Sequence, residues 1–157
     1  IERDLQSTAR RLGWRRLSLK DVGIAFGFTV LLFVVAGVAG ALTQALQPEL
    51  AREIEDRLVQ ITGDASTIWG ALALSVAAGV GEETLFRGAI QPRFGIVVTS
   101  LLFTLVHVQY GLSVITLGVF ALSVLLGLER RRYGTTACIL THSTYNFVAI
   151  ALQHAAP

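Results

Sequence analysis

Two adjacent glutamates and an arginine end a long apolar stretch in the middle of the chain. Residues 65–81 contain no charged side chain, and Glu82, Glu83 and Arg87 then follow. Glu83 and Arg87 are four residues apart, so they share one face of a helix. A charge at the centre of a membrane helix costs about 2.5–3.5 kcal/mol on insertion scales. We therefore expect these side chains to face a protein interior, where they could do chemistry.

Two further polar pairs repeat the same four-residue spacing in other apolar segments. Phe103 precedes His107 by four residues, and His142 precedes Asn146 by four. Each pair therefore lies on one helix face. Taken alone, each pair is as typical of a buried structural contact between helices as of a functional site.

The depth of these residues in a membrane favours a shared site. Glu83 lies ten residues from Arg93, and His142 lies ten residues from Arg132. At about 1.5 Å per residue both are about 15 Å from the basic end of their helices, and His107 is about 21 Å from it. Because three segments reach a similar depth, we predict that their polar groups meet in one cavity.

The residue types in this cavity predict hydrolysis by an activated water. A carboxylate and a histidine beside one water form a general base. A second histidine with an amide one helical turn away offers two donors for an oxyanion. The chain contains no Gly-x-Ser-x-Gly and no His-Glu-x-x-His motif, and its apolar segments hold no aspartate after Asp21. The single cysteine, Cys138, lacks an activating neighbour and is expected to be buried.

The composition is that of an integral membrane protein with one domain. Of 157 residues 53% are hydrophobic and only 15% are charged, against about 25% in soluble domains. Mean hydropathy is +0.61. Residues 22–48 and 94–128 contain no Asp, Glu, Lys or Arg. Runs of about 20 apolar residues can cross a bilayer as helices.

The expected fold class is an all-α, polytopic transmembrane helix bundle of about five spans with short amphipathic surface helices. Residues 1–20 form a basic amphipathic membrane-surface segment, and residues 21–157 form one transmembrane domain with its catalytic core at about 66–153. A short acidic helix near residues 49–63 is also expected on the membrane surface. The expected spans are 21–46, 66–91, 94–109, 112–128 and 135–152.

Local signals set several of these boundaries. Ser18 and Asp21 have the spacing of a capping box, and Pro48 is suited to the first turn of the next helix. Pro92 is expected to end the second span, and Tyr110 with Gly111 is expected to form a tight turn. The basic residues fall consistently on one side, which is the cytosolic side by the positive-inside rule.

Three motifs in this order resemble the CPBP family, which comprises type II CAAX prenyl endopeptidases and the bacteriocin-processing or self-immunity proteins of the Abi group. The motif residues are Glu82, Glu83 and Arg87; Phe103 and His107; and His142 and Asn146. The resemblance covers roughly residues 66–153. It implies a membrane-embedded endopeptidase whose cavity opens toward the cytosol.

The resemblance also implies a role for each motif residue. Glu82 and His107 would activate water, Glu83 and Arg87 would orient the first motif, and His142 and Asn146 would form the oxyanion site, with Phe103 in the cavity wall. We expect no cofactor. If a metal is present, it would be zinc held by Glu82, His107 and His142.

The substrate is expected to be a membrane-anchored peptide or protein, which in this family includes prenylated CAAX tails. The arginine-rich composition favours a prokaryotic plasma membrane, with the bilayer and its phosphates as partners and no nucleic acid. Two alternatives stay open. The same cavity could bind a partner in a non-catalytic immunity or scaffold protein, or it could relay protons in a transporter.

Overall fold

The computed structural model is built of helices, as the apolar periodicity predicts, and it contains no strand in the residues that it describes, 4–63, 67–107, 110–111 and 113–155. The elements in chain order are α1 (Leu5–Arg11), α2 (Leu19–Leu46), α3 (Pro48–Thr62), α4 (Ile68–Glu83), the π-helix η2 (Thr84–Ile90), α5 (Gln91–Val106) and α6 (Val114–Ala155).

The predicted signals at the start of α2 and α3 are confirmed. The Ser18 hydroxyl accepts from the Asp21 backbone N–H, and the Asp21 carboxylate accepts from the Ser18 backbone, which completes the capping box. Pro48 occupies the first turn of α3, where its missing N–H leaves no bond unmade. These caps explain why α2 begins directly after the basic segment.

Two glycines, and not Pro92, bend the helices. Gly95 within α5 has φ 75° and Gly134 within α6 has φ 79°, a left-handed conformation that glycine adopts without steric cost. The expectation that Pro92 ends its helix is wrong, because Pro92 falls in the first turn of α5, where proline is tolerated. The bend at Gly134 divides α6 into two arms.

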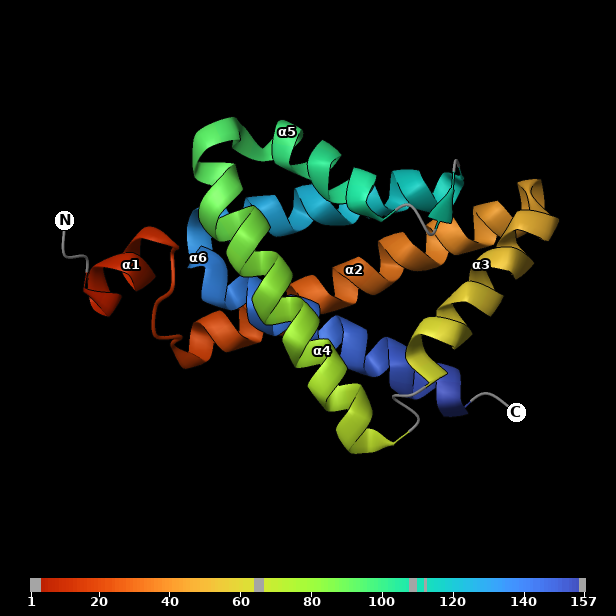
Figure 1. Ribbon diagram of the computed structural model, residues 1–157, viewed down its shortest axis with the longest axis horizontal. Coiled ribbons are helices and arrows are strands. Elements are labelled where there is room, and N and C mark those ends of the chain that lie inside the picture. Colours follow the sequence, from red (N-terminus) through yellow and green to blue (C-terminus); the bar gives the residue numbers. More distant parts are fainter. Residues whose placement is uncertain (1–3, 64–66, 108–109, 112, 156–157) are drawn as a thin grey trace.

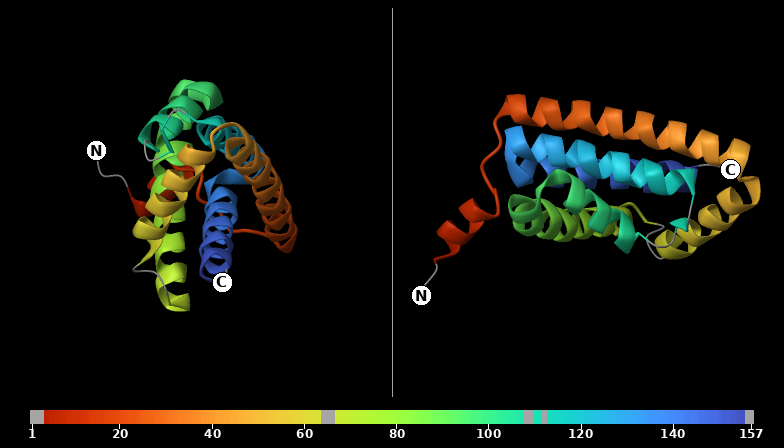
Figure 2. Two further views of the ribbon diagram at one scale, coloured as in Figure 1. Left: turned by 90° about the vertical axis from the view of Figure 1, so that its right-hand side faces the viewer. Right: turned by 90° about the horizontal axis from the view of Figure 1, so that it is seen from above.

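α6 is the central helix of the fold, and it packs against α2, α4 and α5. Figure 1 shows α1 at one end of the molecule and α3 at the other, with the long helices between them. Figure 2 shows α2, the first arm of α6 and α4 running in successive layers. The functional motifs therefore lie on helices that all contact one element.

Small residues let α6 approach its neighbours closely. A Cβ added at Gly79 of α4 would overlap the Ser143 hydroxyl of α6, and one added at Gly118 would lie 2.6 Å from the Ala39 side chain of α2. Such close crossings are typical of helices packed in membranes. Since Gly79 is one turn before Glu83 and Ser143 follows His142, this crossing brings the first and third motifs together.

Two helical stretches, Leu19–Leu46 and Ile68–Val106, are long and apolar enough to cross a membrane, judged by length and composition within the described residues. The second stretch joins α4, η2 and α5 across the bend at Gly95. The five-span arrangement and its orientation stay predictions. Helix α3 does more than lie on a surface, because Ile54 is 2% exposed and packs into the interior.

The N-terminal segment forms hydrogen bonds with residues on both sides of the bend in α6. The Gly13 carbonyl accepts from the Thr135 backbone N–H at 2.9 Å, and the Thr135 hydroxyl donates to the Leu12 carbonyl at 2.6 Å. The Arg15 side chain donates to the Tyr133 carbonyl at 2.6 Å. These bonds satisfy backbone groups that the bend at Gly134 exposes.

Candidate active site

A buried ion pair forms the base of the site. Arg87 Nε lies 3.1 Å from Glu83 Oε2, and both side chains are 0% exposed. The i, i+4 spacing predicted this pair, although Arg87 lies in the π-helix η2, a rare form that often marks functional sites. Burying one of these charges without the other would be costly. The pair therefore holds both groups at fixed positions.

Arg87 is also fixed by α5 and α6. Its Nη2 donates to the Ser123 carbonyl at 3.2 Å and to the Ser123 hydroxyl at 3.0 Å. Its guanidinium lies 4.5 Å from the centroid of the Phe103 ring, within cation–π range. Arg87 thus joins the first motif to the second through Phe103.

The other oxygen of Glu83 contacts the third motif. Glu83 Oε1 is 2.7 Å from His142 Nδ1. A carboxylate paired with an arginine accepts hydrogen bonds, so Nδ1 is assigned as the donor in this contact. Glu83 therefore orients the His142 ring and leaves Nε2 for a ligand in the adjoining cavity.

The second histidine faces the other glutamate across a wider gap. His107 Nδ1 is 2.7 Å from the Phe103 carbonyl, which can only accept, so Nδ1 carries a proton. Nε2 of the neutral ring is then an acceptor. It lies 3.9 Å from Glu82 Oε2, too far for a direct hydrogen bond but suited to a bridging water. The Glu82 side chain is 34% exposed and the His107 side chain 18%.

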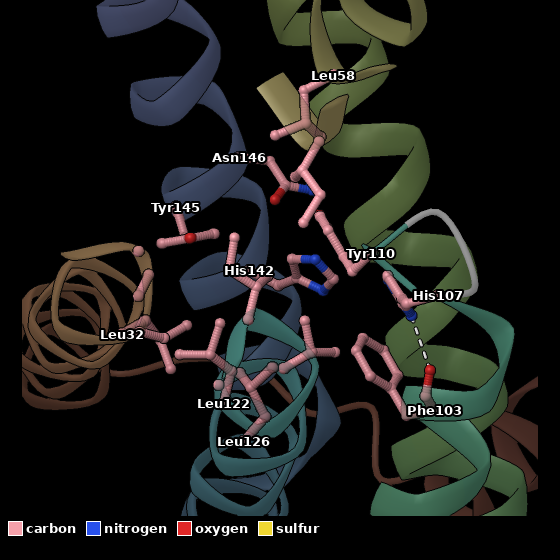
Figure 3. Close-up of a pocket in the computed structure, with 17 residues that line it drawn as sticks. Leu32, Leu58, Phe103, His107, Tyr110, Leu122, Leu126, His142, Tyr145 and Asn146 are labelled. Carbon is pink, nitrogen blue, oxygen red and sulfur yellow. Dashed lines mark hydrogen bonds between the residues drawn. The ribbon is translucent and has the colours of Figure 1, made fainter. Parts of the chain in front are cut away.

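His107 and His142 line a cavity of about 260 Å³, whereas Glu82 and Glu83 are not among its lining residues. In Figure 3, His107 and Phe103 reach it from one side, and His142 and Asn146 reach it from α6. The remaining walls are largely apolar and come from α2, α3 and the first arm of α6, including Leu32, Ile54, Leu58, Leu122 and Leu126. A mostly apolar pocket with a few convergent polar groups is typical of a ligand site.

The structure brings the predicted residues together without testing their roles. Glu83, Arg87 and His142 form one contact chain, Glu82 and His107 face each other, and Asn146 lines the cavity. Among the described residues, no group of three or more His, Cys, Asp and Glu is placed to hold a metal, so Glu82, His107 and His142 do not form the zinc set considered above.

Several contributors to the site were missed by sequence reasoning. Ser123 anchors Arg87, and Tyr110 stacks on His107 with ring centroids 6.2 Å apart. Glu129 is 0% exposed, although it directly precedes three arginines in the sequence, and it was not singled out from the sequence. The short acidic helix near residues 49–63 was expected, but nothing in its sequence showed that α3 lines a cavity.

Long apolar helices that enclose ionisable side chains define a helical membrane protein with an internal polar site. The family model described as Type II CAAX prenyl endopeptidase Rce1-like matches residues 64–148, more than half of the 157-residue chain. The chain belongs to this family of integral membrane peptidases, as the three motifs predicted. Neither the comparison with curated proteins nor that with solved structures gives a match.

Proposed function

We propose that this protein is an intramembrane endopeptidase that hydrolyses a peptide bond of a membrane-associated substrate with an activated water. Membership of a peptidase family supports the reaction class. The observation that carries the proposal is the 3.9 Å separation of Glu82 Oε2 and His107 Nε2 near the cavity that His142 and Asn146 line.

Glu82 and His107 act together on one water. Both atoms that face the gap are acceptors, so a water between them donates one proton to each and turns an oxygen lone pair toward the substrate. The water oxygen attacks the carbonyl carbon of the scissile bond. The proton that it loses passes to this pair and then to the leaving amine as the C–N bond breaks.

His142 and Asn146 stabilise the negative oxygen that forms in this attack. Both line the cavity from one face of α6. The Asn146 amide is one donor, and His142 Nε2 is a second donor when that nitrogen carries a proton, while Nδ1 contacts Glu83 Oε1 at 2.7 Å. The Glu83–Arg87 pair keeps this ring in place. In this mechanism Glu82 takes part in the reaction, whereas Glu83 positions the His142 ring.

The cavity favours an apolar residue or lipid-modified side chain next to the scissile bond. Its walls include leucines from α2 and α6 together with Ile54 and Leu58 from α3. Family membership points to a membrane-associated peptide substrate in general. A prenylated CAAX tail is the first substrate to test, and the enclosing apolar walls also suit unmodified apolar segments.

The test is cleavage of membrane-anchored peptides, with and without a prenyl group, by the purified protein in lipid nanodiscs. We expect cleavage by the wild type and by Glu55→Gln, which alters an exposed glutamate on α3. Glu82→Ala and His107→Ala should each reduce kcat by about 10²–10⁴-fold. Unaltered circular dichroism and melting temperature would show that both variants remain folded.

Full activity of both alanine variants would refute the water-activation scheme. A non-catalytic immunity or scaffold protein predicts a different result, namely no cleavage by the wild type and a bound partner that Glu82→Ala retains. Proton flux into liposomes that depends on Glu82 would instead support a transporter.

A further inference from the structure

Glu129 is a buried carboxylate that the proposed reaction does not use. It lies in the first arm of α6, it is 0% exposed, and the charges of Glu83 and Arg87 act on it. Removing a carboxylate from water costs several kcal/mol unless its partners compensate. The contacts of Glu129 therefore indicate what holds it there.

A hydrogen bond of Glu129 crosses the bend of α6. The Thr141 hydroxyl donates to Glu129 Oε1 at 2.7 Å, whereas the same hydroxyl is 3.3 Å from the Ala25 carbonyl of α2. The shorter contact to a carboxylate is the stronger one. Glu129 precedes the bend at Gly134 and Thr141 follows it, so this bond joins the two arms of α6 from inside.

Thr141 is the neighbour of His142, and its backbone is held from the opposite side. Its carbonyl accepts from the Thr29 hydroxyl of α2 at 3.3 Å. The peptide that carries His142 is therefore fixed by α2 on one side and by Glu129 on the other. A shift of this peptide would change the 2.7 Å contact between His142 and Glu83.

We propose that Glu129 is a positioning residue for His142: through Thr141 it fixes the angle between the two arms of α6 and thereby the place of the His142 ring between Glu83 and the cavity. The Thr141 hydroxyl makes the 2.7 Å contact with Glu129 Oε1, and the Cys138 thiol, also in the second arm of α6, acts on the same carboxylate. The kinetic consequence rests on the proposed function, whereas the effect on the ring does not.

Three variants test the role of the hydrogen bond. Glu129→Leu and Thr141→Val remove it, whereas Glu129→Gln keeps an oxygen that can accept from Thr141. Thr43→Val is the matched control, because Thr43 is 0% exposed and its hydroxyl donates within its own helix, to the Ala39 carbonyl. Each variant is prepared with ¹⁵N-histidine in nanodiscs, so that the imidazole resonances of the three histidines can be compared.

We expect Glu129→Leu and Thr141→Val to move the His142 Nδ1 resonance and to leave that of His154 in place. Their kcat should fall about 10–100-fold with KM within about twofold, because small displacements of a catalytic group cost this much. Glu129→Gln should restore the resonance and most of kcat. Thr43→Val should match the wild type in both.

An unchanged His142 resonance in Glu129→Leu and Thr141→Val would overturn the proposal, whatever the activity. Loss of activity in Glu129→Gln with a wild-type His142 resonance would also overturn it, since the charge and not the hydrogen bond would then matter. If the wild type cleaves no peptide, the proposed function fails, and the resonance alone still decides the role of Glu129.

Discussion

Glu82 and Glu83 are neighbours in the sequence, yet they occupy opposite environments. The Glu83 side chain is 0% exposed and contacts Arg87 at 3.1 Å and His142 at 2.7 Å. The Glu82 side chain is 34% exposed and faces His107 at 3.9 Å without a direct hydrogen bond. Glu83 is held by two partners, whereas the Glu82 oxygen that faces His107 is buried without a hydrogen-bond partner among the described residues.

The difference follows from the helix on which both residues lie. Adjacent positions on a helix point about 100° apart, so a helix that turns Glu83 toward α6 turns Glu82 toward a different neighbour. One arginine cannot pair with two carboxylates that point apart, so Arg87 contacts Glu83 and not Glu82. In the proposed mechanism, Glu83 is accordingly the positioning group and Glu82 the reactive one.

The largest expected effect on stability separates the two glutamates. Glu83→Leu or Arg87→Leu leaves a buried charge without its partner and should lower the free energy of unfolding by about 3–5 kcal/mol. The double variant should recover much of this loss. Glu82→Gln should lower the free energy of unfolding by less than about 1 kcal/mol, because this side chain is 34% exposed. Unfolding in mixed detergent micelles measures this free energy for all four variants.

Equal destabilisation by Glu82→Gln and Glu83→Leu would contradict this division between the two carboxylates. Additive losses in the double variant would show that Glu83 and Arg87 do not act as a pair.

The second prediction concerns Asn146, one of the two proposed oxyanion donors. Asn146→Ala removes one proposed oxyanion donor, which should reduce kcat by about 10²–10³-fold. KM and the melting temperature should stay close to the wild type, since the amide acts on the transition state. The control is Gln153→Ala, which alters an amide on the same helix outside the cavity-lining set. An increase in KM alone would assign Asn146 to substrate binding.

The helix crossing that separates the two carboxylates gives a third prediction. Gly79→Ala should destabilise the protein by about 1–3 kcal/mol, because the added Cβ would overlap the Ser143 hydroxyl. Gly81→Ala on the same helix meets open space and should stabilise it by about 0.5–1 kcal/mol. Thermal unfolding compares the two. If both glycines tolerate alanine, α4 does not depend on this close approach.

The sequence predicts the helices and the convergence of the motifs for physical reasons. Charges in apolar helices are costly enough to need partners, and the four-residue spacing places Glu83 on the face of Arg87. The contact of Glu83 with His142 was not predicted, because it depends on how closely α4 crosses α6.

Glu129 is the clearest example of a residue whose burial the sequence does not predict. A lone acid before three arginines is typical of a solvated turn, yet Glu129 is 0% exposed in the first arm of α6. The residues around the bend at Gly134 also contact the N-terminal segment, more than 100 residues away in sequence. Patterns within one segment carry no information on such distant contacts.

A smaller effect than that of Gly79→Ala is expected in the N-terminal segment that hydrogen-bonds to the bend of α6. Arg15→Ala removes the hydrogen bond to the Tyr133 carbonyl and the ion pair with Asp21, which should cost about 0.5–1.5 kcal/mol because Arg15 is partly exposed. Arg16→Ala, next to it and also exposed, should cost less. If the contacts of Arg15 also fix the angle between the two arms of α6, Arg15→Ala should lower kcat severalfold, whereas Arg16→Ala should not. Equal kcat in both variants would show that the contacts of Arg15 affect stability alone, so that contacts within α6, such as Glu129–Thr141, would set the bend.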